Sequence, residues 1–188
     1  DEQMEALAGS DALPPLAAAL ALVAAKISIA EYAELMMRLL SERAWLLAHV
    51  VDEDGLAKLG RRLHRQLNCE SVPPLDEAAL REAARALIET GGKTDGPNGE
   101  RIAAWLEGGH DDLSPAYRSV FFTDKGQVRK TLATKAAQKR LPGILDTLQA
   151  EAERLECARG RALVELTLAL LRLGLDVADR YTRVKRRR

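Results

Sequence analysis

The residues with the strongest claim to chemistry are Gly92-Lys93-Thr94, which have the types found at the end of a phosphate-binding P-loop. A P-loop also needs a glycine five positions before its second glycine, where this chain has Leu87. It further needs a buried strand before it and a helix after it, so that backbone N–H groups cradle the phosphates. The pattern here predicts a preceding helix instead, so we predict no ATP site in this chain.

No other residues are spaced for catalysis or metal binding. None of the three histidines stands at a metal-ligand spacing from another histidine, a cysteine or an acid. No Ser/His/Asp order can be argued, and no GxSxG string occurs. Neighbouring carboxylates such as Asp111 and Asp112, or Glu151 and Glu153, have no evident partners, so we interpret them as solubilising. The sequence predicts no catalytic residue, no metal ligand and no cofactor in this chain.

The segment from Tyr117 to Arg140 is the most informative part of the sequence. It holds seven Lys and Arg residues against one acid, Asp124, and four serines and threonines stand among them. Lysine and arginine neutralise phosphates, and neighbouring hydroxyls donate to phosphate oxygens. We predict that this segment grips nucleic-acid backbone without reading bases. The predicted contacts are Arg118, Lys125, Arg129, Lys130, Lys135, Lys139 and Arg140.

Two readings of this segment stay open at the level of sequence. Its aromatic residues could stack on bases, but for Phe121 and Phe122 we favour anchoring of the loop onto the helical body. The charges could equally be an ordinary solvated face. A second basic run, from Arg180 to Arg188, has six Lys and Arg and no acid. The net charge of zero is therefore a cancellation between two basic segments and an acidic remainder.

The elements that must position these residues are predicted to be helices. Apolar residues make up 47% of the 188 residues and are mostly Ala and Leu, which favour helix over strand. Capping signals, proline and glycine positions and three-to-four spacing place the helix boundaries. The expected helices cover about 14–25, 28–47, 56–67, 76–89, 97–107 and 142–185, and one more short helix opens at Ser114 and Pro115. Polar breaks are expected at 52–55 and 91–99, and a turn or small hairpin at 121–128.

We therefore predict an all-α fold, an irregular helical bundle with a long C-terminal helix over 142–188. The expected organisation is one helical domain over 1–188. The chain lacks an apolar run long enough for a membrane span, so we expect no membrane partner. Cys69 and Cys157 belong to no CxxC pair and are expected to be free thiols in a reducing, cytoplasmic compartment. Both ends read as cuts through a longer chain.

Three strings carry a resemblance to a known family. They are GGKTD (Gly91–Asp95), FFTDKGQVRKTLATK (Phe121–Lys135) and RYTRVKRRR (Arg180–Arg188). Together, in this order and among Ala/Leu-rich helices, they resemble the AddA-type helicase–nuclease subunits of bacterial double-strand-break repair. The matching part is similar to the helical 1B insertion of a UvrD/RecB-like superfamily 1 helicase, and the first 70 residues match only in general character.

The resemblance implies a domain that contacts duplex DNA ahead of the unwinding fork, independent of sequence. Its long helix would return to a motor core outside this chain, where ATP and Mg²⁺ would be bound. The implied partners are DNA, the rest of the helicase chain and a second nuclease subunit. A helical protein-interaction module with basic faces for an acidic partner is the alternative. A free-standing DNA-binding regulator is less favoured, because no helix–turn–helix with a clear recognition helix stands out.

Overall fold

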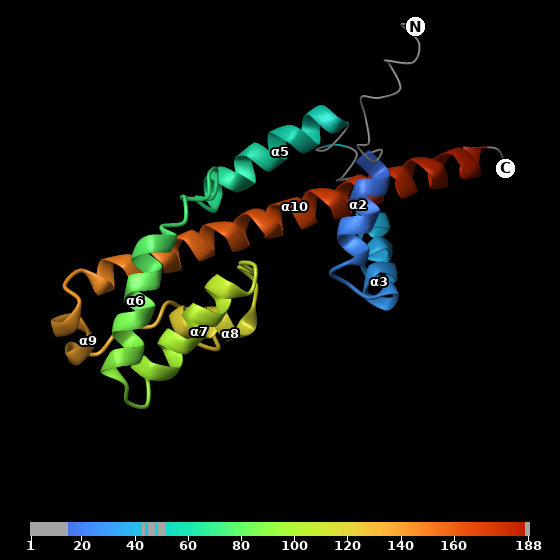
Figure 1. Ribbon diagram of the computed structural model, residues 1–188. Coiled ribbons are helices and arrows are strands. Elements are labelled where there is room, and N and C mark those ends of the chain that lie inside the picture. Colours follow the sequence, from blue (N-terminus) through green and yellow to red (C-terminus); the bar gives the residue numbers. More distant parts are fainter. Residues whose placement is uncertain (1–14, 43, 45–47, 49–51, 187–188) are drawn as a thin grey trace, which may run out of the picture. The chain divides into compact units, whose positions relative to one another are not determined.

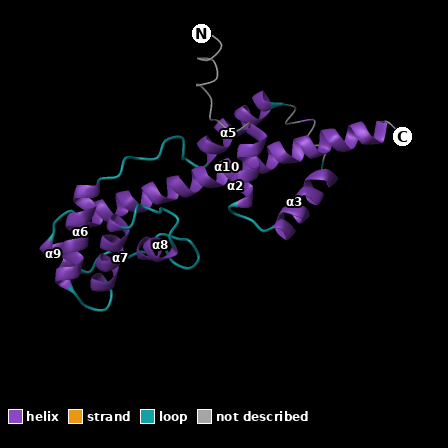
Figure 2. Cartoon of the chain, turned by 45° about the vertical axis from the view of Figure 1, so that its right-hand side comes forward, coloured by secondary structure: helices purple, strands orange, loops and turns teal. Residues whose placement is uncertain are grey.

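The computed structural model describes residues 15–42, 44, 48 and 52–186 (Figure 1). In this part of the chain there are eight helices and no strand, which confirms the all-α prediction (Figure 2). Contacts divide it into two compact units, where the sequence pattern predicts a single domain. Unit 1 comprises the described residues up to Gln66 together with those from Ala162 onward, and unit 2 is Leu67–Arg161. None of the described helices is long and apolar enough to cross a membrane.

Unit 1 contains α2 (Pro15–Ala24), α3 (Ile29–Ser41), α5 (Glu53–Gln66) and the later part of α10 (Ile144–Arg186). The predicted capping box opens α3, because Ser28 Oγ accepts from the backbone N–H of Glu31 and the Glu31 carboxylate accepts from the N–H of Ser28. α2, α3 and α10 share a small apolar cluster whose buried members are Ala19, Val23, Met36, Ala169 and Leu173.

Two of the predicted element boundaries lie in unit 1. The expected break at 52–55 is wrong, because Asp52 accepts a hydrogen bond from the Gly55 N–H and α5 begins at Glu53. α3 ends at Ser41, and the expected continuation to 47 falls largely outside the described residues.

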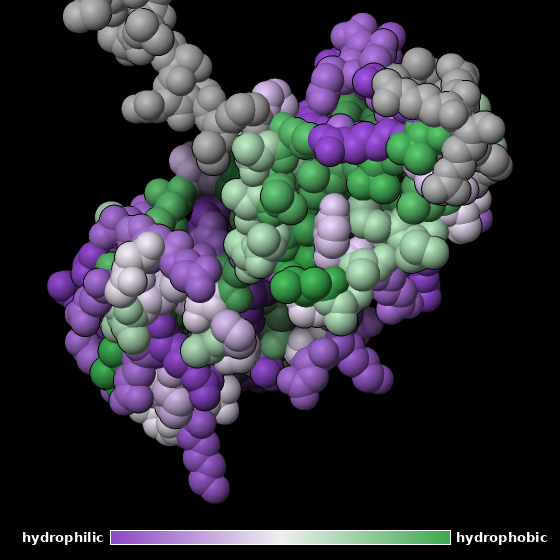
Figure 3. Space-filling model, turned by 90° about the vertical axis from the view of Figure 1, so that its right-hand side faces the viewer, coloured by the Kyte–Doolittle hydropathy of each residue, from purple (hydrophilic) through white to green (hydrophobic). Residues whose placement is uncertain are grey.

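Exposed apolar side chains remain on α2 and α3, and Figure 3 shows apolar groups gathered at the surface. The most exposed of them are Leu20, Ile29 and Met37.

Unit 2 contains α6 (Glu77–Thr90), α7 (Asp95–Glu107), α8 (Pro115–Phe121), α9 (Lys135–Arg140) and the first part of α10. Asp76 caps α6 as predicted, its carboxylate accepting from the Ala79 N–H. One apolar core joins all these helices, and it contains the aromatic side chains of Trp105, Tyr117, Phe121 and Phe122.

The start of α7 corrects the sequence prediction. The stretch 91–99 was expected to be a loop, but the helix already begins at Asp95 and Gly99 lies inside it. A Cβ on Gly99 would lie 2.7 Å from the Ala84 carbonyl oxygen and 2.9 Å from the Ile88 nitrogen, both in α6. The glycine is therefore present because two helix backbones approach closely, not because the chain turns.

The expected hairpin and long helix are both found. Phe122 and Val128 form an antiparallel bridge, and the Thr123 N–H donates to the Gln127 carbonyl across a turn in which Gly126 has a φ of 72°. α10 is one helix of 43 residues, about 65 Å long at 1.5 Å per residue. Gly160 lies inside this helix without breaking it, and its missing Cβ leaves room for the Cys69 side chain. α9, capped by Thr134, has no counterpart among the predicted helices.

Candidate nucleic-acid interface

The aromatic residues of the basic segment are buried in unit 2. Phe121 and Phe122 are 0% and 4% exposed, and Tyr117 is also buried. Tyr117 stacks on Trp105 with ring centroids 4.1 Å apart, and the Tyr117 and Phe121 rings form a T-shaped pair. These rings anchor the segment onto the helical body, as favoured from the sequence, and offer no free face to a base.

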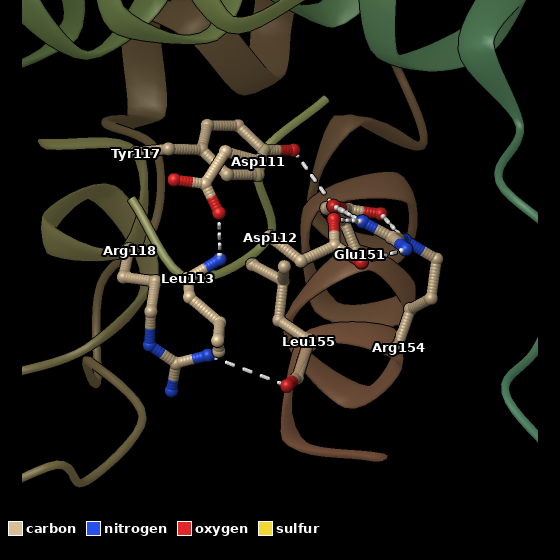
Figure 4. A network of polar contacts seen from close by, with 8 residues as sticks. All are labelled: Asp111, Asp112, Leu113, Tyr117, Arg118, Glu151, Arg154 and Leu155. Atoms are coloured by element: carbon tan, nitrogen blue, oxygen red, sulfur yellow. Dashed lines mark hydrogen bonds and ion pairs between the residues drawn. The ribbon is translucent and has the colours of Figure 1, made fainter. Parts of the chain in front are cut away.

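A polar network lies beside these rings (Figure 4). The Tyr117 hydroxyl donates to Glu151 at 2.7 Å, and the Arg154 guanidinium donates to both Glu151 and Asp112. Burial, together with the Glu151 charge, raises the pKa of the Tyr117 hydroxyl above its ordinary value. Burial by itself lowers the pKa of Arg154, but the hydrogen bonds to Glu151 and Asp112 outweigh it and raise the pKa. Asp112 and Glu151 were expected to be solubilising; instead they hold this network together.

Two of the seven predicted contact residues bind the chain's own carboxylates. The Arg118 guanidinium lies 3.2 Å from Glu156, donates to the Leu155 carbonyl and covers the Phe122 ring at 4.5 Å. Its side chain is only 16% exposed. Arg140 pairs with Glu89 at 2.7 Å, and both of these side chains are about half exposed. Arg118 thus fastens α8 to α10, and Arg140 fastens α9 to α6.

The four predicted lysines are arranged differently. Lys125, Lys130, Lys135 and Lys139 are exposed. Within the described part of the chain, none of them has a carboxylate within ion-pair distance. Lys125 is in the hairpin turn, Lys130 follows the turn, and Lys135 and Lys139 are four residues apart on α9, which places them on one helix face.

The Arg129 side chain is hydrogen-bonded, but no described carboxylate neutralises its positive charge. Its Nε donates to the Ser119 carbonyl at 2.9 Å, and its backbone N–H donates to the Phe121 carbonyl. Both partners are neutral, so the charge of the guanidinium remains available. Among the hydroxyls of the segment, Ser119 already donates to the Ala116 carbonyl, and Thr134 donates to Asp95 and caps α9.

Two concave sites border Ser119 in unit 2. The first, here called the hairpin pocket, encloses about 510 Å³ and contains Arg118, Lys125 and Arg159 beside one acid, Asp124. The second, here called the Lys93 pocket, encloses about 330 Å³. It is lined by Lys93, Thr94, Pro97, Asn98, Arg101, Ser119, Arg129 and Thr131. The structure thus brings Arg129 together with Lys93 and Arg101, two cations that lie outside the predicted set.

The second basic run is largely paired where it is described. Arg180 and Arg183 lie 2.8 Å and 2.6 Å from Asp176 and Asp179, one turn earlier on α10. The side chains from Lys185 to Arg188 lie outside the described residues. This run therefore adds little free positive charge over its described length.

The described residues contain no group of three His, Cys, Asp or Glu side chains that could hold a metal ion. The helix α6 leads into the turn that carries Lys93, so the strand required by a P-loop does not precede Gly92-Lys93-Thr94. No protein-family model, curated protein or solved structure compared with this chain matches it. The resemblance to AddA-type subunits accordingly stays a prediction.

Proposed function

We propose that this chain is a DNA-contacting helical domain of an ATP-dependent helicase and exonuclease acting in double-strand-break repair. In this proposal it binds the duplex backbone ahead of the fork, independently of sequence, in the cytoplasm. ATP and Mg²⁺ would be bound by other parts of the parent protein, because α6 precedes Gly92-Lys93-Thr94 where a P-loop needs a strand, and the described residues hold no group of three His, Cys, Asp or Glu side chains that could bind a metal ion.

The observation that carries the proposal is the set of four exposed lysines with no ion pair in the described structure. Lysines that are not neutralised by the protein can neutralise phosphates and release counterions from DNA. Arg118 and Arg140 are engaged with Glu156 and Glu89. We therefore assign the backbone contacts to Lys125, Arg129, Lys130, Lys135 and Lys139.

The burial of the aromatic residues supports binding that does not depend on sequence. Phe121 and Phe122 belong to the core, so they cannot stack on unpaired bases without unfolding the hairpin turn. Phosphate contacts fix position on a duplex but carry no direct base information. A segment with exposed lysines and no accessible ring is therefore suited to backbone contact alone.

The proposal is tested by reversing two of these charges, with Lys125→Glu and Lys130→Glu in one variant. The affinity of this variant for duplex DNA should fall by a similar factor for duplexes of unrelated base sequence. The slope of log K against log salt should become shallower by about 0.9 for each lost phosphate contact, about 1.8 for the pair. Fluorescence anisotropy with labelled duplexes over a salt series measures both effects.

A matched control is Lys26→Glu with Lys58→Glu, which changes the net charge equally in unit 1. Equal losses in the two variants would show that only total charge matters and would overturn the assignment. Unchanged affinity and slope in the Lys125/Lys130 variant would favour the alternative, a protein-interaction module that presents the same lysines to an acidic partner.

A further inference from the structure

The Lys93 pocket gathers three cations from three segments of unit 2. Lys93 lies in the turn between α6 and α7, Arg101 lies in α7, and Arg129 follows the hairpin turn. No Asp or Glu lines the pocket. Positive charges brought together without a counter-charge repel one another and raise the local potential, so an anion bound among them is stabilised.

The two arginines are oriented by neutral groups. Arg101 donates from one terminal nitrogen to the Asn98 side-chain oxygen at 3.2 Å, and Arg129 donates from Nε to the Ser119 carbonyl at 2.9 Å. Neither bond cancels a charge. None of the three cations has an ion pair with a described carboxylate. Each arginine is thus oriented by a neutral partner and keeps its charge and its other donors for a ligand.

The hydroxyl of Thr94 is a further donor for a ligand, since no hydrogen bond that it donates is found among the described residues. Thr94 occupies the N-cap position of α7, yet its side chain makes no capping hydrogen bond. The next residue, Asp95, is 1% exposed, and its carboxylate accepts from the hydroxyl and N–H of Thr134. The Asp95 carboxylate is thus engaged with Thr134, and it does not line the pocket.

We propose that the Lys93 pocket binds one phosphate group, held by Lys93, Arg101 and Arg129 with hydrogen bonds from Thr94 and Thr131. Planar guanidinium groups suit the two-oxygen recognition of phosphate, and the lysine adds a mobile point charge. The phosphate is carried either by a small phosphate ester or by a polynucleotide backbone. The inference rests on this pocket alone and does not require the chain to bind duplex DNA.

The test titrates the 188-residue chain with inorganic phosphate and follows backbone amide shifts by NMR at constant ionic strength, with chloride as the reference anion. Saturable shifts should concentrate in residues 93–101 and 129–131. The variant Lys93→Ala with Arg101→Gln should weaken binding at least about tenfold, because charge-assisted hydrogen bonds are lost. The control Lys58→Ala with Arg62→Gln removes the same charge from α5 and should bind phosphate as the unmodified chain does.

Absence of saturable shifts at the pocket, or equal weakening by the control variant, would overturn the inference. Both substituted pocket residues are exposed, so circular dichroism should show an unchanged fold. A second arm repeats the titration with a short duplex. Shifts at the pocket that the Lys93/Arg101 variant removes would identify backbone phosphate as the ligand, whereas shifts with inorganic phosphate only would identify a small phosphate ester.

The two proposals fail separately. If reversal at Lys125 and Lys130 leaves duplex binding unchanged while phosphate still binds the pocket, the proposed function fails and the phosphate site stands. If the pocket binds no phosphate while duplex binding depends on Lys125 and Lys130, the phosphate site fails and the proposed function stands.

Discussion

In each unit an arginine binds a carboxylate from a distant part of the chain, but the surroundings of the two arginines differ. In unit 2, Arg154 and Glu151 are buried, with side chains 8% and 5% exposed, and Asp112 completes the set. In unit 1, Arg172 donates two hydrogen bonds to Glu53, both at 2.6 Å, but the Glu53 side chain is 63% exposed. The geometry of the unit 1 pair is as good as that of the network.

We expect burial, more than bond length, to decide what each pair contributes to stability. Exposed pairs contribute little because water screens them and their side chains lose freedom. A buried set becomes costly once one member is missing, because the remaining charge has no water to solvate it. We therefore expect the loss of one member to cost more in the network of unit 2 than in the Arg172–Glu53 pair of unit 1.

The largest expected effect is the loss of Glu151. Glu151→Ala leaves the Arg154 charge and the Tyr117 hydroxyl buried without this acceptor, and unfolding should become easier by about 3–5 kcal/mol. Urea unfolding followed by Trp105 fluorescence, in a Trp45→Phe background, measures this change in unit 2. Glu156→Ala, five residues further along α10, removes a carboxylate that is 44% exposed and should cost less than about 1 kcal/mol. Similar losses in both variants would show that burial does not separate the two kinds of pair.

Removal of the Tyr117 hydroxyl should have the next largest effect. Tyr117→Phe deletes a hydrogen bond to a charged acceptor, with an expected cost of about 1.5–3 kcal/mol near neutral pH. The pKa of Tyr117 is raised in the folded state, so its neutral form contributes stability that is present below pH 10 and is lost as the pH rises further.

Measuring the free energy of unfolding at alkaline pH is a separate check. In the unmodified chain this group should contribute a fall in stability of about 1.4 kcal/mol per pH unit above pH 10, and the Tyr117→Phe variant should lack that contribution. Tyr32→Phe, in unit 1, serves as the control. If tyrosinate absorbance showed all three tyrosines ionising together in the folded chain, the burial of Tyr117 would be contradicted.

A smaller effect is expected at the close approach of α6 and α7. Gly99→Ala forces the two backbones apart and should destabilise unit 2 by about 1–3 kcal/mol. Gly96→Ala is the matched control on the same helix, since a Cβ there would have ordinary contacts at 3.6 Å or more. That control should be neutral or slightly stabilising, because alanine favours helix. Equal effects of the two substitutions, measured by thermal unfolding, would rule out the tight crossing.

The smallest effect is expected in unit 1. Hydrogen bonds from Arg172 lower the pKa of Glu53, so the pair contributes stability above the ordinary pKa of glutamate, lost as the pH falls through the lowered value. Glu53→Gln should cost less than about 1 kcal/mol at neutral pH and should remove this acid dependence. Urea unfolding at neutral and acidic pH measures both, with Glu42→Gln as the control, since Glu42 has no ion pair with another described residue. A cost comparable to that of Glu151→Ala would refute the comparison of the two units.

Local signals predicted much of the fold. Ser28 with Glu31, Asp76 and Pro15 mark helix starts through contacts within one turn, and the structure has helices beginning at or next to each of them. The sequence does not predict the start of α7, because Gly96, Pro97 and Gly99 are residue types typical of loops. The reason for Gly99 lies in α6, which only tertiary packing reveals.

The candidate site was predictable only in part. The density of positive charge in 118–140 identified the segment, but the sequence could not show which cations the protein neutralises. Arg118 meets Glu156 and Arg140 meets Glu89, at separations of 38 and 51 residues. The sequence could not predict the Lys93 pocket for the same reason, because its lining residues come from segments that only folding brings together. Lys93 was singled out only through a P-loop string that does not apply.

The anchoring of the hairpin turn has a consequence for any binding event. Phe121 and Phe122 fix the turn on one side, and the buried Leu132 and Ala133 fix the chain on the other. The conformational entropy of residues 123–131 is therefore lost when the protein folds and not when a ligand arrives. An anion would meet a preorganised surface, and its association would require side-chain adjustment without reshaping of the backbone.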